Sequence, residues 1–136
     1  MTIHKVTNIQ KDIQTKLAKK LLDLIILQLL RTQAMHGYEV IAKIRKTFGV
    51  YFGPSTIYPL LSTLERKKCI SSNWNMDGDR PRKVYQLTEE GNNVLNISED
   101  ALNLICQKMT PNSNTNTTAN TTDSTESPPN TNTGTQ

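Results

Sequence analysis

Three cationic side chains stand within four residues of one another, at Arg80, Arg82 and Lys83. Guanidinium and ammonium groups bind phosphate and carboxylate oxygens, and arginine can do so through two parallel hydrogen bonds. Small hydroxyl side chains occur earlier, in the stretch Gly53–Lys68 with the sequence GPSTIYPLLSTLERKK. Hydroxyls and the N–H groups at the start of a helix also suit phosphate oxygens. These residues indicate an anionic partner, although each group taken alone is also typical of an ordinary solvated surface.

The remaining reactive residues give no support to catalysis. The two histidines, His4 and His36, are not accompanied by a paired nucleophile or a ligand set. The two cysteines, Cys69 and Cys106, match neither a C-x-x-C motif nor the spacing of zinc ligands, so free thiols are expected. We predict no enzyme activity, no metal and no cofactor. Two alternatives stay open for these residues: a metal-sensing site formed by His36 with a cysteine, and a redox switch at Cys106.

The charge of the chain is uneven. Residues 1–110 hold all 16 Lys and Arg residues and 10 of the 12 Asp and Glu residues, which gives them a net charge of +6. A basic segment of this kind permits nucleic acid or a membrane surface as a partner. The most apolar run, residues 21–30, is too short for a bilayer span of about 20 residues, and the N-terminus lacks the apolar core of a signal peptide. We therefore expect a cytoplasmic protein without a membrane partner.

The stretch Gly53–Lys68 has the period of a helix. Ser55, Pro59 and Ser62 fall on its outer face, where their small side chains allow the backbone to approach a groove closely. An interior proline costs about 3 kcal/mol, so we expect the helix to start near Ser55 or Thr56 with a distorted first turn around Pro59. The opposite face should pack inward, because its apolar residues recur at i, i+3, i+4 and i+7: Ile57, Leu60, Leu61 and Leu64.

A long helix is predicted before this stretch, over residues 15–31, with Thr15 as its N-cap. Residues 1–14 are an N-terminal extension that we expect to be partly ordered or helical. The helix carries an apolar arc wider than a small core needs, so one side of it is expected to face a second subunit. The arc consists of Leu17, Leu21, Leu22, Leu24, Ile25, Ile26, Leu29 and Leu30.

A shorter helix is predicted from Tyr38 to Phe48, with Gly49 as its C-cap. Residues 50–53 then form a short connection to Gly53–Lys68. Two short helices joined by a short turn that contains glycine make a helix-turn-helix pattern.

After the second of these helices the hydrophobic period changes from 3.6 to 2, which predicts a β-hairpin. Ile70 and Trp74 share one face of the first strand, and Tyr85 and Leu87 share a face of the second. The turn through residues 76–81 contains an Asp-Gly pair, and the three cations lie at its tip and on the descending strand. A basic hairpin after a helix-turn-helix is typical of a wing that lies along a DNA backbone.

Thr88 is predicted to cap a final helix over residues 88–109, with Glu89 and Glu90 where the helix dipole favours anions. Residues 110–136 are rich in Thr, Asn, Ser and Pro, which predicts a disordered tail. We expect the final helix to pair with the apolar arc of a second copy in a homodimer. The residues assigned to this interface are Leu22, Ile26, Val94, Ala101, Leu102 and Ile105.

These elements predict a mainly helical α+β fold. Residues 15–87 would form a winged helix-turn-helix domain with three helices and a two-stranded wing, followed by a single C-terminal dimerisation helix. A winged-helix module that binds protein, with a merely solvated basic wing, is the alternative. A salt series separates the two, because binding to DNA phosphates weakens as salt rises.

Four motifs follow one another along the chain: HGYEV at residues 36–40, PSTIYPLLSTLERKKCI at 54–70, Trp74, and RPRKVYQLTEEG at 80–91. Over residues 21–109 the sequence resembles the PadR family of transcriptional regulators, in the branch with a single short C-terminal helix. The resemblance implies a dimeric repressor that binds double-stranded DNA at a pseudo-palindromic operator and responds to a small hydrophobic effector. It also implies a DNA-facing set: Tyr38, Ser55, Thr56, Tyr58, Arg80, Arg82 and Lys83. The helical wheel adds Ser62 to this set.

Two features depart from the family pattern. Lys68 and Cys69 stand where many relatives have a glycine after the recognition helix. The turn into the wing is therefore expected to be strained or differently shaped. The Thr- and Asn-rich tail has no counterpart in the family pattern.

Overall fold

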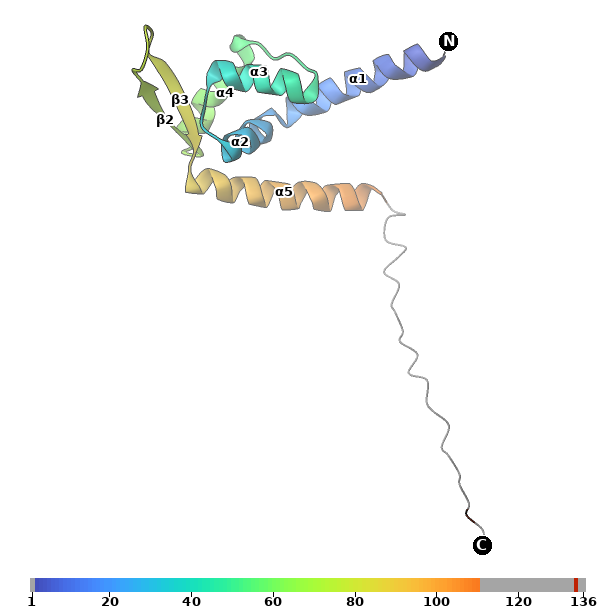
Figure 1. The fold of residues 1–136 in the computed structure, drawn as a ribbon. Helices are drawn as coiled ribbons and strands as arrows, with labels where there is room; N and C mark the ends of the chain where they lie inside the picture. The colour runs from blue at the N-terminus through green and yellow to red at the C-terminus, as the bar shows by residue number, and fades with distance from the viewer. Residues whose placement is uncertain (1, 111–133, 135–136) are drawn as a thin grey trace.

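Five helices and a small sheet make up the described part of the chain in a computed structural model, which describes residues 2–110 and residue 134 (Figure 1). The helices are α1 (Thr2–Lys20), α2 (Leu22–Thr32), α3 (Gly37–Phe48), α4 (Pro54–Arg66) and α5 (Glu89–Met109). The strands are β1 (Met35–His36), β2 (Ile70–Asn75) and β3 (Arg82–Leu87). The tail expected over residues 110–136 lies, apart from Thr110 and Gly134, outside the described residues. Within the described part, no helix is long and apolar enough to cross a membrane.

The long helix predicted over residues 15–31 is two helices in the structure. α1 and α2 meet at Leu21, whose φ of −101° and ψ of 14° depart from helical geometry. Leu21 still makes helical hydrogen bonds in both directions: its amide donates to the carbonyl of Leu17 at 3.0 Å, and its carbonyl accepts from the amide of Ile25 at 2.9 Å. The assignment of Thr15 as N-cap is wrong. Thr15 lies inside α1, where its hydroxyl donates to the carbonyl of Lys11 at 2.9 Å, an alternative that threonine has within a helix.

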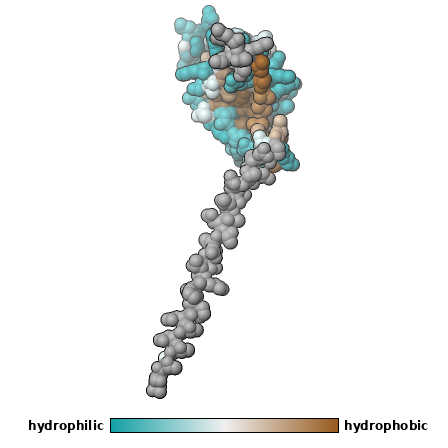
Figure 2. All heavy atoms as spheres, turned by 90° about the vertical axis from the view of Figure 1, so that its right-hand side faces the viewer, coloured by the Kyte–Doolittle hydropathy of each residue, from teal (hydrophilic) through white to brown (hydrophobic). Residues whose placement is uncertain are grey.

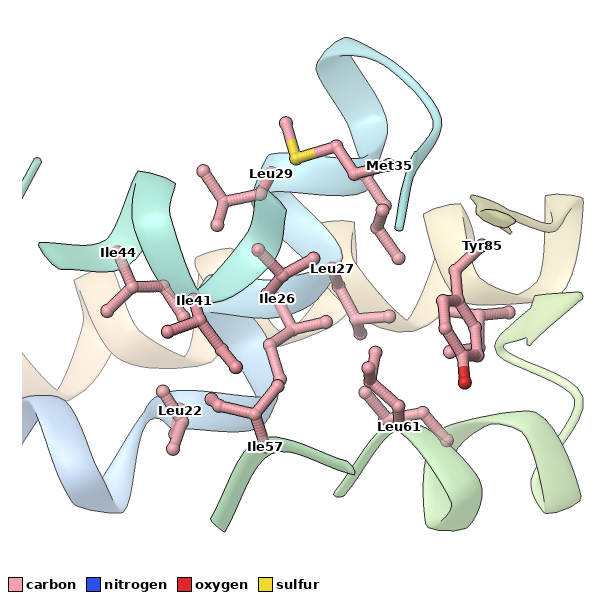
Figure 3. Packing of buried hydrophobic residues seen from close by; sticks show 14 of the residues in the cluster. Leu22, Ile26, Leu27, Leu29, Met35, Ile41, Ile44, Ile57, Leu61 and Tyr85 are labelled. Carbon is pink, nitrogen blue, oxygen red and sulfur yellow. The ribbon is translucent and has the colours of Figure 1, made fainter. Parts of the chain in front are cut away.

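α2 supplies the centre of the core (Figure 3). Its Ile26 and Leu27 are 0% and 1% exposed and belong to the same buried cluster as Ile57 and Leu61 of α4. The wide apolar arc is therefore largely used inside the chain itself. Leu22 and Ile26, which the sequence assigns to a subunit interface, are 3% and 0% exposed in this core and are not available to a partner.

α3 and α4 form the predicted helix-turn-helix. Gly49 is the C-cap of α3 with a left-handed φ of 69°, which confirms that prediction. α4 begins at Pro54, earlier than the predicted start, so Pro59 lies in its second turn and not in its first. The helix nevertheless runs without a break. The Ser55 carbonyl receives no hydrogen bond from Pro59, but both residues are exposed, so solvent can hydrate that carbonyl.

The sheet has three antiparallel strands in the order β1-β3-β2. β2 and β3 form the predicted hairpin, with Ile70 opposite Leu87. β1 is not predicted from the sequence, because two residues are too few to show an alternating pattern. Its Met35 pairs with Tyr85 of β3. The predicted two-stranded wing is thus part of a three-stranded sheet, which ties the start of α3 to the wing.

The turn from α4 into β2 is strained at Lys68, as the missing glycine suggests. Lys68 has a left-handed φ of 63°, a conformation that costs a residue with a side chain about 1 kcal/mol or more. α5 begins against this turn. Thr88 caps α5 as predicted, accepting from the amide of Gly91 at 3.0 Å, and its own amide donates to the carbonyl of Cys69 at 3.1 Å. A Cβ at Gly91 would lie 1.9 Å from that carbonyl oxygen, so only glycine allows this close packing.

Candidate nucleic-acid interface

α4 turns its small polar side chains to solvent. Its apolar stripe packs inward as predicted, with Ile57 and Leu61 both 0% exposed. On the other side Ser55 and Ser62 are exposed, and Thr56 is half-buried. A helix with such short side chains outside can lie deep in the major groove, where hydroxyls can bond to base edges.

A cleft of about 460 Å³ lies between the starts of α3 and α4 on one side and the tip of the wing on the other. We call it the wing cleft. His36, Gly37 and Pro81 contribute to its lining. It brings together five of the residues that the sequence assigns to DNA: Tyr38 from α3, Tyr58 from α4, and Arg80, Arg82 and Lys83 from the wing.

Gly37 explains how Tyr58 reaches the wing cleft. A Cβ at Gly37 would lie 2.6 Å from Cε1 of Tyr58, so the tyrosine ring rests against the backbone of α3. Tyr58 remains 40% exposed in this position. The glycine of the HGYEV motif therefore allows a tyrosine of α4 to lie beside the wing.

The cations of the wing cleft are not equivalent. The Nζ of Lys83 lies 3.3 Å from Oε2 of Glu65 and 5.5 Å from the centre of the Tyr85 ring. Arg80 and Arg82 are exposed and form no ion pair within the described part of the chain. The two arginines can therefore bind an anion directly, whereas Lys83 is already engaged.

Glu65 connects α4 to both strands of the wing hairpin. Its Oε1 accepts a hydrogen bond of 2.7 Å from the hydroxyl of Ser72 on β2, and its Oε2 faces Lys83 on β3. The hydrogen bond from Ser72 lowers the pKa of Glu65, and Lys83 adds to this effect against the opposing effect of burial. Neither Glu65 nor Ser72 is assigned to the site from the sequence. One sequence feature could have pointed to Glu65: it is the only carboxylate in Gly53–Lys68.

His36, the last residue of β1, contacts a carboxylate in the first turn of α3. Its Nε2 lies 2.7 Å from Oε1 of Glu39. Among the described residues there is no group of three or more His, Cys, Asp or Glu suited to a metal ion. Cys69 is buried, Cys106 is exposed, and neither forms a disulfide. His36 therefore acts at the start of α3 as the partner of Glu39.

A helix-turn-helix followed by a basic hairpin, with a cation-lined cleft between them, defines a winged-helix protein of the kind that binds nucleic acid. Residues 26–97 match the model of the transcriptional regulator PadR-like family. The match covers more than half of the chain, and the chain belongs to this family of transcriptional regulators.

Solved structures of similar proteins agree with this assignment. A PadR family transcriptional regulator from Eggerthella lenta is 27% identical, with a TM-score of 0.69 over 83% of this chain and 99% of that one. A transcriptional regulator from Clostridium thermocellum is 25% identical, with a TM-score of 0.63 over 70% and 94%. Bacillus subtilis PadR in complex with operator DNA is 29% identical, with a TM-score of 0.52 over 56% and 44%. The curated proteins contain no match.

Proposed function

We propose that the chain is a sequence-specific DNA-binding regulator in which α4 enters the major groove and the wing lies along the adjoining backbone. The wing cleft carries the proposal, because beside α4 it holds two exposed arginines that form no ion pair with any described residue. The similar PadR from Bacillus subtilis, whose structure is a complex with operator DNA, supports it.

The proposal gives different roles to the helix and the cleft. The hydroxyl side chains of α4, at Ser55, Thr56 and Ser62, would bond to base edges. Lys83 would act indirectly, by holding the wing against Glu65 of α4. Backbone phosphates would be bound by the exposed side chains of the wing cleft: Tyr38, Tyr58, Arg80 and Arg82.

Titration of the full chain against duplex DNA from its own upstream region, with random duplex as competitor, tests this function. Trp74 is the only tryptophan and is 64% exposed on β2, so its fluorescence reports contact between the wing and DNA. We expect tighter binding to the upstream duplex. We also expect log K to fall linearly with log salt, with a slope of about −0.9 per phosphate neutralised. Binding that does not change with salt would contradict the proposal.

We extend the proposal to a homodimer, because two helices expose apolar side chains. On α1, Ile9, Ile13 and Leu17 are 54%, 51% and 56% exposed, and their spacing of four residues places them on one stripe. On α5, Ile97 and Ile105 are 69% and 53% exposed. Figure 2 looks at the side of the molecule toward which α1 and α5 extend, and shows a hydrophobic band between hydrophilic margins.

An apolar groove of about 270 Å³ lies between α2, α3 and α5, with Leu24, Ile25 and Phe48 among its lining residues. We assign α1 of a second copy to this groove, because its exposed stripe of aliphatic side chains has the matching chemistry and is not covered by any other described residues. The proposed subunit interface therefore uses the exposed stripe of α1, and no longer includes Leu22 and Ile26, which are buried in the core. The residues of the sequence-based interface that stay in the proposal are Val94, Ala101, Leu102 and Ile105.

A two-fold dimer presents two copies of α4 and would require a pseudo-palindromic operator with half-sites about one helical turn apart. The proposal includes repression, because a dimer across two half-sites would cover promoter DNA. Release of the DNA on binding of a small hydrophobic effector is its last part. Transcription in vitro from a promoter that carries the operator should fall when the protein is added. An increase would contradict repression.

A further inference from the structure

β2 is an edge strand, because the order β1-β3-β2 leaves no strand on its outer side among the described residues (Figure 1). Natural proteins protect such an edge with a charged residue, a proline or a bulge. The sequence of β2, ISSNWN, contains no charged residue and no proline. Its register with β3 runs without a bulge, from Ile70 opposite Leu87 to Asn75 opposite Arg82. The edge of β2 therefore has none of these protections against pairing with a further strand.

The register shows which backbone groups lie along the free edge. The carbonyl of Cys69 accepts from the amide of Thr88 at 3.1 Å, and these two residues continue the register of β2 with β3 by one pair. In an antiparallel ladder, pairs that exchange hydrogen bonds alternate with pairs that do not. Counting from Cys69, the N–H and C=O groups of Ser72 and Trp74 therefore point away from β3, toward the free edge.

We propose that two copies of the protein associate through β2, strand against antiparallel strand, about a two-fold axis at Asn73. Ile70 is 1% exposed, so its backbone is closed to a neighbour, which leaves Ser72 and Trp74 to pair. With the axis at Asn73, Ser72 of each copy lies opposite Trp74 of the other and exchanges both backbone hydrogen bonds with it. The indole of Trp74, 64% exposed in the single chain, then lies diagonally about 7–8 Å from its counterpart, within reach of an aromatic side chain.

The charges at the two ends of β2 complement each other in this arrangement. Asp77 and Asp79 lie in the turn after β2, and Lys67 and Lys68 lie in the turn before it. All four side chains are exposed, and none forms an ion pair in the described part of the chain. Antiparallel pairing places the end of one strand beside the start of the other, so the acidic turn of each copy meets the basic turn of the second copy. This complementarity identifies the partner of the free edge as a second copy of the chain.

The β2 interface is separate from the interface assigned to α1 and α5 in the proposed homodimer, because the two use different elements. Two different two-fold interfaces on one chain link dimers into larger assemblies. Pairing of β2 would therefore join neighbouring dimers through their wings. On DNA this pairing would make occupation of neighbouring operators cooperative, and only this last consequence rests on the proposed function.

Disulfide cross-linking of the full chain without DNA tests this register. Asn73 would face its own counterpart in a pair without hydrogen bonds, with Cα atoms about 4.5 Å apart, which a disulfide can bridge. The background is Cys106→Ser, which removes the exposed native thiol. We expect Asn73→Cys to give a cross-linked species of twice the chain mass under mild oxidation. Asn75→Cys is the matched control, because Asn75 is exposed on the same face of β2 but would lie about 13 Å along the strand from its counterpart.

Reversal of charge tests the contact between the turns. Lys67→Glu should lower the yield of the Asn73→Cys cross-link, because it opposes two acidic turns, and adding Asp79→Lys should restore the yield. Thermal unfolding of each variant checks that the fold is intact. Equal cross-linking of Asn73→Cys and Asn75→Cys would overturn the pairing of β2, as would no cross-linking of either when both thiols react with a small thiol reagent. Failure of the unmodified protein to bind DNA would contradict the proposed function and leave the pairing of β2 in place.

Discussion

Two surfaces have no packing partner among the described residues, and they differ in their chemistry and in how other elements hold them in place. The polar surface consists of the side chains of the wing cleft and the outer face of α4. The apolar surface consists of the exposed stripes of α1 and α5. The polar surface is held by strand pairing, by the contact of Tyr58 with Gly37, and by the pair of Glu65 with Lys83. On the apolar surface, the side chains of residues 7–14 of α1 are all exposed. The N-terminal part of α1 extends away from the other helices (Figure 1).

The difference shows which surface can exist in a single chain. Exposed cations and hydroxyls are hydrated in the absence of DNA, so the polar surface can be preformed. Exposed apolar area is unfavourable by roughly 25 cal/mol per Å². Most helices in proteins also depend on packing of an apolar face for their stability. In the proposed homodimer a second copy would therefore be needed to order the apolar surface, whereas the polar surface would need DNA only for its proposed function.

Charge on the apolar surface should have the largest effect on operator binding. Ile105→Glu places a carboxylate in the proposed interface and is expected to give monomers in sedimentation experiments. Two linked half-sites bind more tightly than one by about 10²–10⁴-fold, so operator affinity should fall by a factor in this range. Asn103→Glu is the matched control, because it adds the same charge at an exposed position of the same helix. If Ile105→Glu sediments as a dimer, or if the unmodified chain sediments as a monomer at micromolar concentration, the apolar surface is not the interface.

Gly91→Ala tests the junction between the two surfaces, where α5 packs on the turn into the wing. The added Cβ would lie 1.9 Å from the carbonyl oxygen of Cys69 and 2.8 Å from Cδ1 of Leu87. The backbone oxygen cannot move aside as a flexible side chain can, so α5 must shift, at a cost of about 3 kcal/mol in the free energy of unfolding. Urea denaturation measures this loss, with Asn93→Ala as a control on the exposed side of the same turn. Equal stability of the two variants would mean that α5 is not anchored at this turn.

Much of the polar surface is predictable because its elements carry local signals. The period of Ile57, Leu61 and Leu64 gives α4 its inward face, and Gly49 and Thr88 mark helix ends through their own backbone and side-chain chemistry. The strain at Lys68 is likewise visible as a missing glycine. Each of these features depends on residues a few positions apart in the chain.

The features that are not predictable depend on contacts between distant segments. β1 is defined only by its pairing with β3, and the use of Leu22 and Ile26 inside the core depends on how α2 packs against the other elements of the buried cluster. Sequence patterns cannot distinguish an apolar side chain in the core from one in a subunit interface, since both are apolar. The same reasoning applies to Lys83, whose charge looks equivalent to that of Arg82 until Glu65 is placed beside it.

The smallest expected effect separates Arg82 from Lys83 on the polar surface. Arg82→Ala should reduce the magnitude of the log K against log salt slope by about 0.9, because it removes an exposed arginine that forms no ion pair in the described part of the chain. Lys83→Ala should leave the slope nearly unchanged, because Glu65 already compensates the ammonium group. A double-mutant cycle of Lys83→Ala with Glu65→Gln should give a coupling in the free energy of unfolding of about 0.2–1 kcal/mol, the range for exposed ion pairs. Equal slopes for Arg82→Ala and Lys83→Ala would show that Lys83 leaves Glu65 and binds a phosphate when DNA is present.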